Sequence, residues 1–280
     1  MLRRNFSLSN SYGEFIRGDI RHAENVKNAP AIIICHGFKG FKDWGFFPSL
    51  AENLAETGYV SLAFNFSRNG FGTDTQNFTN LDLFAKNTYT HEIEDLGCVI
   101  NAIQNEKIGK GLIDPSRIGL LGHSRGAGIV LLYASKNKNI ETVVTWAAIS
   151  TVERFSEDQI NAWTQNGYIE MENKRTKQIM RIERDLLQDI EKNKSELNIL
   201  AAAEKIEIPT MLIHGANDDS VSQSESQEIY KHLSSEVKEI HIIEDANHTF
   251  GIAHPMQSRS EEYSVVLDLT EAWFDKYFLR

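Results

Sequence analysis

The sequence predicts an α/β fold in which a mostly parallel β-sheet is covered by helices on both faces. Short apolar runs alternate along the chain with amphipathic helical patterns, which is typical of strand–helix–strand units. Several runs, including Ala31–Cys35 and Thr142–Ile149, are almost continuously apolar, and strands buried on both faces have that composition. The length of 280 residues suits one large domain with an inserted segment better than two equal domains.

The individual elements can be placed in order along the chain. Residues 5–22 alternate in polarity, which predicts an antiparallel hairpin at the sheet edge with Gly13 near its turn. Residues 67–90, rich in Asn, Thr, Gly and Phe, are expected to form a long loop. The other predicted strands are Ala31–Cys35, Tyr59–Phe66, Arg117–Leu121, Thr142–Ile149, Thr210–His214 and Glu239–Ile243. The predicted helices are Pro48–Thr57, 91–106, Gly126–Ser135 and 261–278.

The segment between Thr151 and Lys205 breaks this alternation. It is charged and shows no strand pattern. Two interpretations are open: a helical layer on the surface of the sheet, or a cap inserted over the functional site. The segment's apolar side chains recur at helical spacing, namely Ile179, Ile182, Leu186 and Ile190.

Charge and cysteine content restrict the setting and the partners. The formal net charge of −10 disfavours nucleic acid and anionic membrane surfaces, which carry the same sign. No stretch reaches the length of a membrane span, and no apolar segment follows Arg3 and Arg4 as in a signal peptide. Cys35 and Cys98 are interpreted as small buried hydrophobic residues rather than a disulfide, so a reduced, cytoplasmic setting is expected.

A candidate nucleophile lies in the sequence Gly122-His123-Ser124-Arg125-Gly126, which fits the pattern G-x-S-x-G. The pattern directly follows a predicted strand and opens a predicted helix. This is the strand–turn–helix context of a nucleophile elbow, in which the serine sits on a strained turn and the glycines make room for it. The spacing of phosphate-binding and dinucleotide-binding loops is not present. Ser124 is therefore the predicted nucleophile.

A serine needs a base to take its proton and an acid to orient that base. Two candidate acids, Asp218 and Asp219, follow the predicted strand Thr210–His214. The spacing from Gly215 to Asp218 to Val221 favours Asp218. Asp219 is then expected to be a loop carboxylate or a helix cap. His248 lies on the loop after the next strand and is favoured over His254 as the base. His241 and His214 are expected to have structural or supporting roles.

Acyl transfer also requires N–H groups for the oxyanion. The residue after the nucleophile supplies one, so Arg125 is a predicted donor. The loop after Ala31–Cys35 supplies the other, with Gly37 at the turn and Phe38 as the donor. Nearby aromatic side chains are expected either to line the substrate pocket or to pack the first helix, and these are Phe41, Trp44, Phe46 and Phe47.

Taken together, these motifs resemble the α/β-hydrolase superfamily. The resemblance covers the chain from about residue 20 to its end, and the H-G-F loop with the insertion is most similar to the esterase branch that includes feruloyl and cinnamoyl esterases. Dienelactone-hydrolase-like and oligopeptidase-like proteins form neighbouring branches, but dienelactone hydrolases carry cysteine where Ser124 stands. The resemblance implies an eight-stranded sheet with one antiparallel strand.

The resemblance also implies a division of the chain. Residues 1–150 and 206–280 would form the hydrolase core, and residues 151–205 would form a lid whose main element is a helix over Arg175–Lys192.

The expected function is hydrolysis of a small to mid-sized carboxylic ester through Ser124, His248 and Asp218. No cofactor and no metal is expected, because neither zinc-ligand spacing nor a cofactor fingerprint is present. A peptidase, amidase or thioesterase with the same three residues is the alternative, and a non-catalytic ligand-binding protein is a further one. The expected partner is a small-molecule ester, and the chain is expected to be a monomer or a homodimer.

Overall fold

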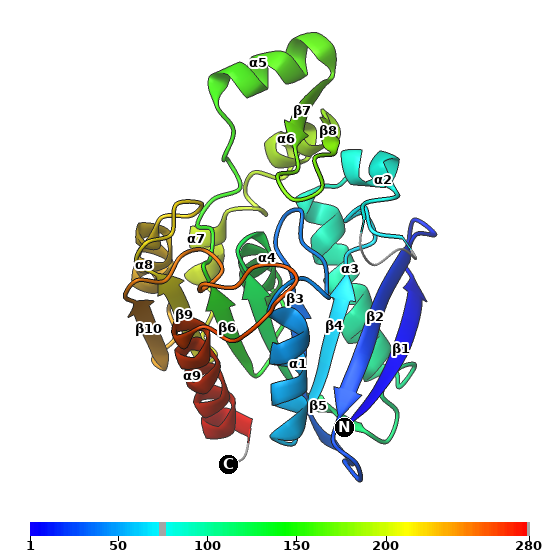
Figure 1. Ribbon diagram of the computed structural model, residues 1–280, viewed down its shortest axis with the longest axis vertical. Helices are drawn as coiled ribbons and strands as arrows, with labels where there is room; N and C mark the ends of the chain where they lie inside the picture. The colour runs from blue at the N-terminus through cyan, green and yellow to red at the C-terminus, as the bar shows by residue number, and fades with distance from the viewer. Residues whose placement is uncertain (73–76, 279–280) are drawn as a thin grey trace.

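The computed structural model describes residues 1–72 and 77–278, which include an eight-stranded sheet (Figure 1). Only β2 runs antiparallel to its neighbours, and the other pairs of adjacent strands are parallel. This confirms the predicted sheet with one antiparallel strand. In spatial order the strands are β1 (Leu2–Ser9), β2 (Phe15–His22), β4 (Val60–Asn65), β3 (Ala29–Cys35), β5 (Ile113–His123), β6 (Thr142–Trp146), β9 (Thr210–Gly215) and β10 (Lys238–Ile243).

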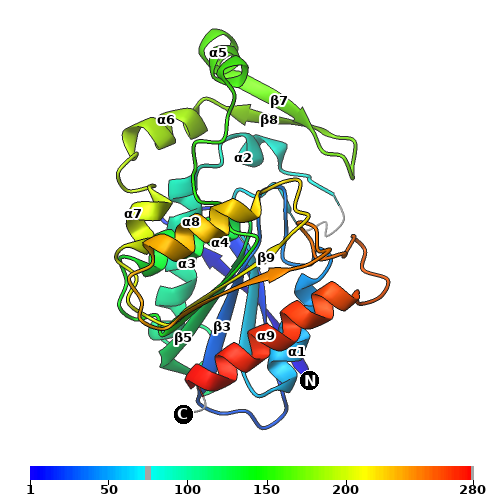
Figure 2. The ribbon, with the colours of Figure 1, turned by 90° about the vertical axis from the view of Figure 1, so that its left-hand side faces the viewer.

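Helices cover both faces of the sheet (Figure 2). One face packs against α1 (Phe47–Glu56) and α9 (Glu261–Phe278), whose apolar side chains share a core with Trp146. The opposite face is covered by α3 (Tyr89–Gln104), α4 (Arg125–Ala134), α7 (Ile199–Ala203) and α8 (Gln223–His232). Because the sheet is buried on both sides, β3 and β6 are fully buried, as their continuous apolar runs predict.

The amino-terminal hairpin and most of the predicted elements are confirmed. β1 and β2 pair in register around Gly13, whose φ of 78° suits a residue without Cβ. α9 has the predicted bounds, and the other predicted strands and helices are found with ends shifted by a few residues. Cys35 is buried as predicted, whereas Cys98 is half-buried.

The predicted long loop 67–90 contains a short helix, α2 (Leu81–Ala85), and it ends at Tyr89, where α3 begins. Phe71 forms an isolated antiparallel bridge with Phe78. The part of this prediction that covers residues 73–76 lies outside the described residues.

The prediction that residues 151–205 are helical is wrong in part. A two-stranded antiparallel sheet of β7 (Tyr168–Glu172) and β8 (Ile179–Glu183) lies between α5 (Glu157–Asn166) and α6 (Asp185–Lys192), so no continuous helix spans Arg175–Lys192. These elements lie beyond the carboxyl ends of the parallel strands (Figure 1).

The hairpin forms because the apolar pattern here also fits a period of two. Met180 and Ile182 on β8 are buried, while Ile179 and Arg181 on the same strand are exposed, so alternate side chains face the small core under α5. Asn173 forms the turn, since its side-chain oxygen accepts hydrogen bonds from the N–H groups of Arg175 and Thr176. Within the described part of the chain, no helix is both long and apolar enough to cross a membrane.

Candidate active site

Ser124 occupies a sharp turn between β5 and α4. Its backbone is strained, with φ 58° and ψ −120°, and its N–H donates to the carbonyl of Trp146 at 2.8 Å on the neighbouring strand. His123 and Arg125 on either side are buried, whereas Ser124 is partly exposed. The turn therefore presents the hydroxyl at the carboxyl edge of the sheet, as the G-x-S-x-G pattern predicts.

The two glycines of this pattern are required by close backbone contacts. A Cβ on Gly122 would lie 2.4 Å from the carbonyl oxygen of Gly126. A Cβ on Gly126 would lie 2.5 Å from the carbonyl oxygens of both Cys35 and His36 on β3 and its loop. Any side chain at either position would push the start of α4 away from the sheet.

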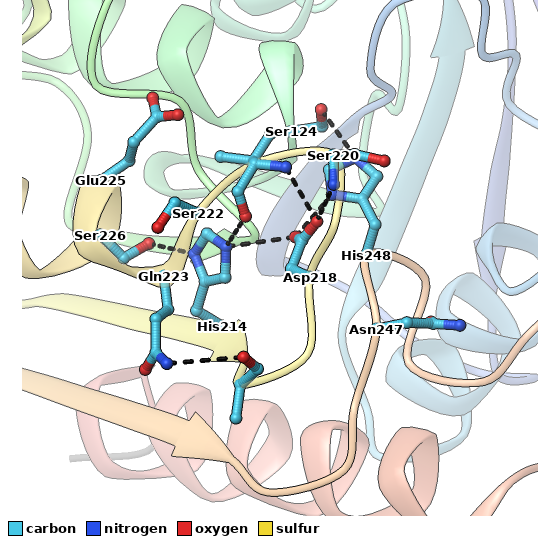
Figure 3. Close-up of polar contacts among 12 residues, drawn as sticks. Ser124, His214, Asp218, Ser220, Ser222, Gln223, Glu225, Ser226, Asn247 and His248 are labelled. Atoms are coloured by element: carbon cyan, nitrogen blue, oxygen red, sulfur yellow. Dashed lines mark hydrogen bonds and ion pairs between the residues drawn. The ribbon is translucent and has the colours of Figure 1, made fainter.

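The structure brings together the three residues predicted to form a triad (Figure 3). Nε2 of His248 lies 3.0 Å from Oγ of Ser124, and Nδ1 of His248 lies 2.7 Å from Oδ2 of Asp218. Since a carboxylate can only accept, Nδ1 carries the proton donated to Asp218, and Nε2 is free to accept the serine proton. The three side chains come from the ends of β5, β9 and β10.

The Asp218 carboxylate is buried and fully hydrogen-bonded. Its Oδ1 accepts from the N–H groups of Ser220 and Val221 at 2.8 and 2.9 Å. Burial raises the pKa of Asp218, but the hydrogen bonds with His214 and His248 outweigh this effect and hold the pKa well below its usual value. Asp218 is therefore ionised near neutral pH.

His214, for which the sequence predicts a structural or supporting role, contacts the same carboxylate oxygen that His248 binds. Its Nε2 lies 3.2 Å from Oδ2 of Asp218 and 2.9 Å from the carbonyl of Val221, while its Nδ1 lies 2.7 Å from Oγ of Ser226. Nε2 carries the proton, because both of its neighbours accept.

The alternative candidates lie elsewhere. Asp219 is exposed, and the cap of α8 is Ser222, not Asp219. His254 accepts a hydrogen bond from the N–H of Gly45 at 3.0 Å and packs against Phe41. His241 contacts Glu239 on the surface of β10.

The loop after β3 lies directly against the nucleophile. A Cβ on Gly37 would lie 3.0 Å from Cβ of Ser124 and 3.1 Å from the carbonyl oxygen of His123, so a larger residue would have to push the loop away from the nucleophile. In the described part of the chain, neither the N–H of Phe38 nor that of Arg125 has an acceptor. Phe38 follows Gly37 and Arg125 follows Ser124, so both unpaired N–H groups belong to residues next to this contact, as a site for an oxyanion requires.

His36 holds this loop in place as a neutral side chain. Its Nδ1 donates to the carbonyl of Gly37 at 2.9 Å, and its Nε2 accepts from the N–H of Phe66 and the side chain of Asn69. Burial, with the nearby Arg125 charge, lowers the pKa of His36 to about 4.

His123 is a supporting residue that sequence reasoning missed. Its Nε2 donates to the carbonyl of His248 at 2.9 Å, and its ring lies 4.8 Å from the His248 ring. Burial and the neighbouring His248 lower its pKa to about 3. The position of His123 inside the elbow pattern was a sequence signal for such a role. Its partner, the carbonyl of His248, lies 125 residues away in the sequence and could not be read from that pattern.

Two cavities open on Ser124. The larger, about 420 Å³, lies between the β3 loop and the 151–205 segment, which contributes Arg154, Phe155, Gln159 and Met171. The smaller, about 190 Å³, is lined by Trp44 and Phe47. Of the predicted aromatic wall, Trp44 and Phe47 thus border a cavity, whereas Phe46 packs in the core.

The fold and the site define an α/β-hydrolase of the serine hydrolase class. The profile of the prolyl oligopeptidase family matches residues 44–278, so the chain belongs to that family.

Similar proteins are also found among curated sequences and solved structures. An Escherichia coli protein described as an uncharacterized 31.7 kDa protein in the traX-finO intergenic region is 30% identical over 126 residues, which are 45% of this chain and 39% of that relative. The match thus spans less than half of that relative's length. YitV of Bacillus subtilis (strain 168), named as a candidate esterase, is 25% identical over 81% of this chain and 85% of its own.

Among solved structures, Est1E from Butyrivibrio proteoclasticus with ferulic acid bound has a TM-score of 0.73 at 15% identity, covering 98% of this chain and 100% of that one. At this identity the likeness shows the fold alone.

Proposed function

We propose that the protein is a carboxylic-ester hydrolase that works through Ser124, His248 and Asp218. The observation that carries this proposal is the continuous hydrogen-bonded chain from Ser124 Oγ through His248 to the ionised Asp218, beside two unpaired backbone N–H groups. The esterase-like relatives support the choice of ester over other acyl substrates.

The proposed reaction proceeds in two acyl-transfer steps. Oγ of Ser124 attacks the ester carbonyl carbon while Nε2 of His248 takes the hydroxyl proton. The N–H groups of Phe38 and Arg125 hold the resulting oxyanion. When the carbon–oxygen bond to the alcohol breaks, His248 returns the proton to the leaving alcohol. Water then repeats the sequence and releases the acid from Ser124.

Residues 151–205 are proposed to act as a lid on the core formed by residues 1–150 and 206–280. The support is positional: α5, β7 and the preceding loop supply side chains to the larger cavity beside Ser124. A lid of this kind would exclude water and size the substrate. The cytoplasmic setting, the monomeric or dimeric state and the small-molecule ester partner remain expectations from the sequence.

The test is hydrolysis of a short-chain 4-nitrophenyl ester series by the wild type and by Ser124→Ala, together with labelling by a fluorophosphonate probe. We expect turnover and labelling in the wild type and neither in the variant. Asp219→Asn serves as a matched control and should retain both. Absence of turnover and labelling in the folded wild type would refute the esterase proposal. Labelling without ester turnover would point to the family's alternative, amide or peptide cleavage, or to thioesters.

A further inference from the structure

The larger cavity beside Ser124 is positively charged although the whole chain has a net charge of −10. Its lining includes Lys39, Arg125 and Arg154, and no carboxylate among the described residues borders it. The rest of the lining is mostly apolar, with Phe38, Tyr89 and several aliphatic side chains. Such a lining favours an anionic or neutral substrate and disfavours a cation.

Arg154 is already neutralised. Its Nη1 donates to both carboxylate oxygens of Glu225 at 2.7 and 2.6 Å. It therefore contributes little unpaired charge to the cavity. Arg125 is likewise paired with the buried Glu92, so Lys39 and the unsatisfied part of the Arg125 guanidinium decide the character of the cavity.

Lys39 has no such partner. The residue is half-buried, and within the described residues its ammonium forms neither an ion pair nor a hydrogen bond. It lies 5.6 Å from the centroid of the Phe38 ring. Burial and the Lys174 charge lower the pKa of Lys39, as expected for an ammonium without a counter-ion.

Arg125 is buried and only partly satisfied. Its Nε donates to Glu92 at 2.7 Å, and its guanidinium lies 3.8 Å from the Tyr89 ring and 5.4 Å from the Phe38 ring. Its Nη2 is buried and has no hydrogen-bond partner among the described residues. Buried polar groups are normally paired, so an unpartnered N–H on a residue that lines the cavity points to an acceptor that arrives with the ligand.

We propose that Lys39 and Arg125 form an anion subsite and that the esters hydrolysed here carry a carboxylate. This inference rests on the proposed esterase function and names its substrate class. Both cations adjoin the Phe38 ring, and each is next to a residue that contacts the reacting atoms: Lys39 follows Phe38, and Arg125 follows Ser124. In such a substrate, we therefore expect only a short chain of atoms between the carboxylate and the ester carbonyl.

The experiment compares two pairs of substrates that match in shape and differ in charge. For the acyl side, mono-4-nitrophenyl succinate is set against 4-nitrophenyl 4-methylpentanoate. For the alcohol side, 4-carboxyphenyl acetate is set against 4-carbamoylphenyl acetate. We expect the wild type to favour the anionic member of at least one pair in kcat/KM by about tenfold or more, the effect of one hydrogen bond to a charged group. The preference should shrink as ionic strength rises.

The variants assign this preference to the subsite. Lys39→Met should reduce the anionic-to-neutral ratio of kcat/KM by about tenfold, and Lys39→Arg should restore most of it. Lys138→Met removes the same charge from an exposed position beyond the far end of α4 and should keep the wild-type ratio. Comparing ratios between variants cancels the intrinsic reactivity of each ester.

Arg125 is tested in the double variant Arg125→Met/Glu92→Gln, which removes the buried pair without leaving Glu92 charged and alone. If it folds, as judged by circular dichroism, it should show the same selective loss. Equal ratios in the wild type and Lys39→Met for both substrate pairs would overturn the subsite while leaving the esterase proposal intact. No turnover of any of the four esters would instead refute the proposed function.

Discussion

Nε2 of His214 lies 3.2 Å from Oδ2 of Asp218, the same oxygen that receives Nδ1–H of His248 at 2.7 Å (Figure 3). Both His214 and Asp218 have fully buried side chains. His214 is itself fixed by Ser226 and Val221. His214 thus fixes the Asp218 carboxylate, which in turn orients the proposed base His248. His214 is therefore a positioning residue that acts on His248 only through Asp218.

Removing the His214 imidazole should therefore lower turnover more than substrate binding. We expect His214→Leu to reduce kcat by about tenfold or more, since Asp218 loses one charge-assisted hydrogen bond, with KM changed much less. His214→Gln can place an amide N–H near the same oxygen and should recover a large part of kcat. Steady-state kinetics on a 4-nitrophenyl ester checks both. His241→Gln, on the surface of β10, is the control. Equal kcat in the Leu and Gln variants would contradict the positioning role.

The glycine at the start of α4 should be far less replaceable than another helical glycine. Gly126→Ala places a Cβ 2.5 Å from two backbone oxygens, so we expect a loss of about 3 kcal/mol in the free energy of unfolding. Gly97→Ala within α3 meets only the Tyr133 side chain, at 3.3 Å, and should be neutral or stabilising by up to about 1 kcal/mol. Urea denaturation measures both. Similar stabilities of the two variants would show that the elbow is not held by backbone contact.

The neutral histidines beside Ser124 should make the fold acid-sensitive. The pKa values of His36 and His123 are lowered to about 4 and about 3, below the value of about 6.5 in an unfolded chain. Between about pH 4 and about pH 6.5 the unfolded state therefore binds more protons than the folded state. Stability that is fully present above about pH 6.5 is therefore lost as the pH falls towards 4.

Denaturation at a series of pH values tests this sensitivity. Each proton changes the unfolding free energy by about 1.4 kcal/mol per pH unit. His36→Asn and His123→Asn should each reduce the slope of the unfolding free energy against pH below pH 6.5 by up to the contribution of one proton. An unchanged slope in both variants would mean that other groups cause the acid sensitivity.

The proposed lid can be loosened through its central tryptophan. Trp163 is fully buried, donates from Nε1 to the carbonyl of Ile182 at 2.8 Å, and packs edge-on against Phe155, which lines the larger cavity. Trp163→Ala should make residues 151–205 more sensitive to limited proteolysis and weaken discrimination between acyl chain lengths. Ile160→Ala, at a site on α5 that is 38% exposed, is the control on the same helix. A Trp163→Ala variant with increased proteolysis but unaltered chain-length profile would argue against the lid.

Local patterns predicted most of the sheet and the placement of the three candidate residues. The elbow around Ser124 is specified within a few residues, because the strand, the two glycines and the following helix are contiguous. Asp218 and His248 could be placed because parallel strands end at a common edge, so a residue just after β9 and one just after β10 approach the end of β5. The burial of both faces of the sheet followed from its apolar runs.

Contacts between distant segments decided the rest. The spacing of Ile179, Ile182, Leu186 and Ile190 fits a helix, whereas Met180 and Ile182 fit one face of a strand. Only packing beneath α5 and pairing with β7 selected the strand. The links of His214 to Asp218, His123 to His248 and Lys39 to its cavity depend on side-chain burial, which periodicity does not encode. The sequence by itself placed the candidate reactive groups, because each lies just after a strand that local patterns predict. The tertiary structure decided which groups support them and what charge the pocket presents, because those properties arise where separate segments exclude water together.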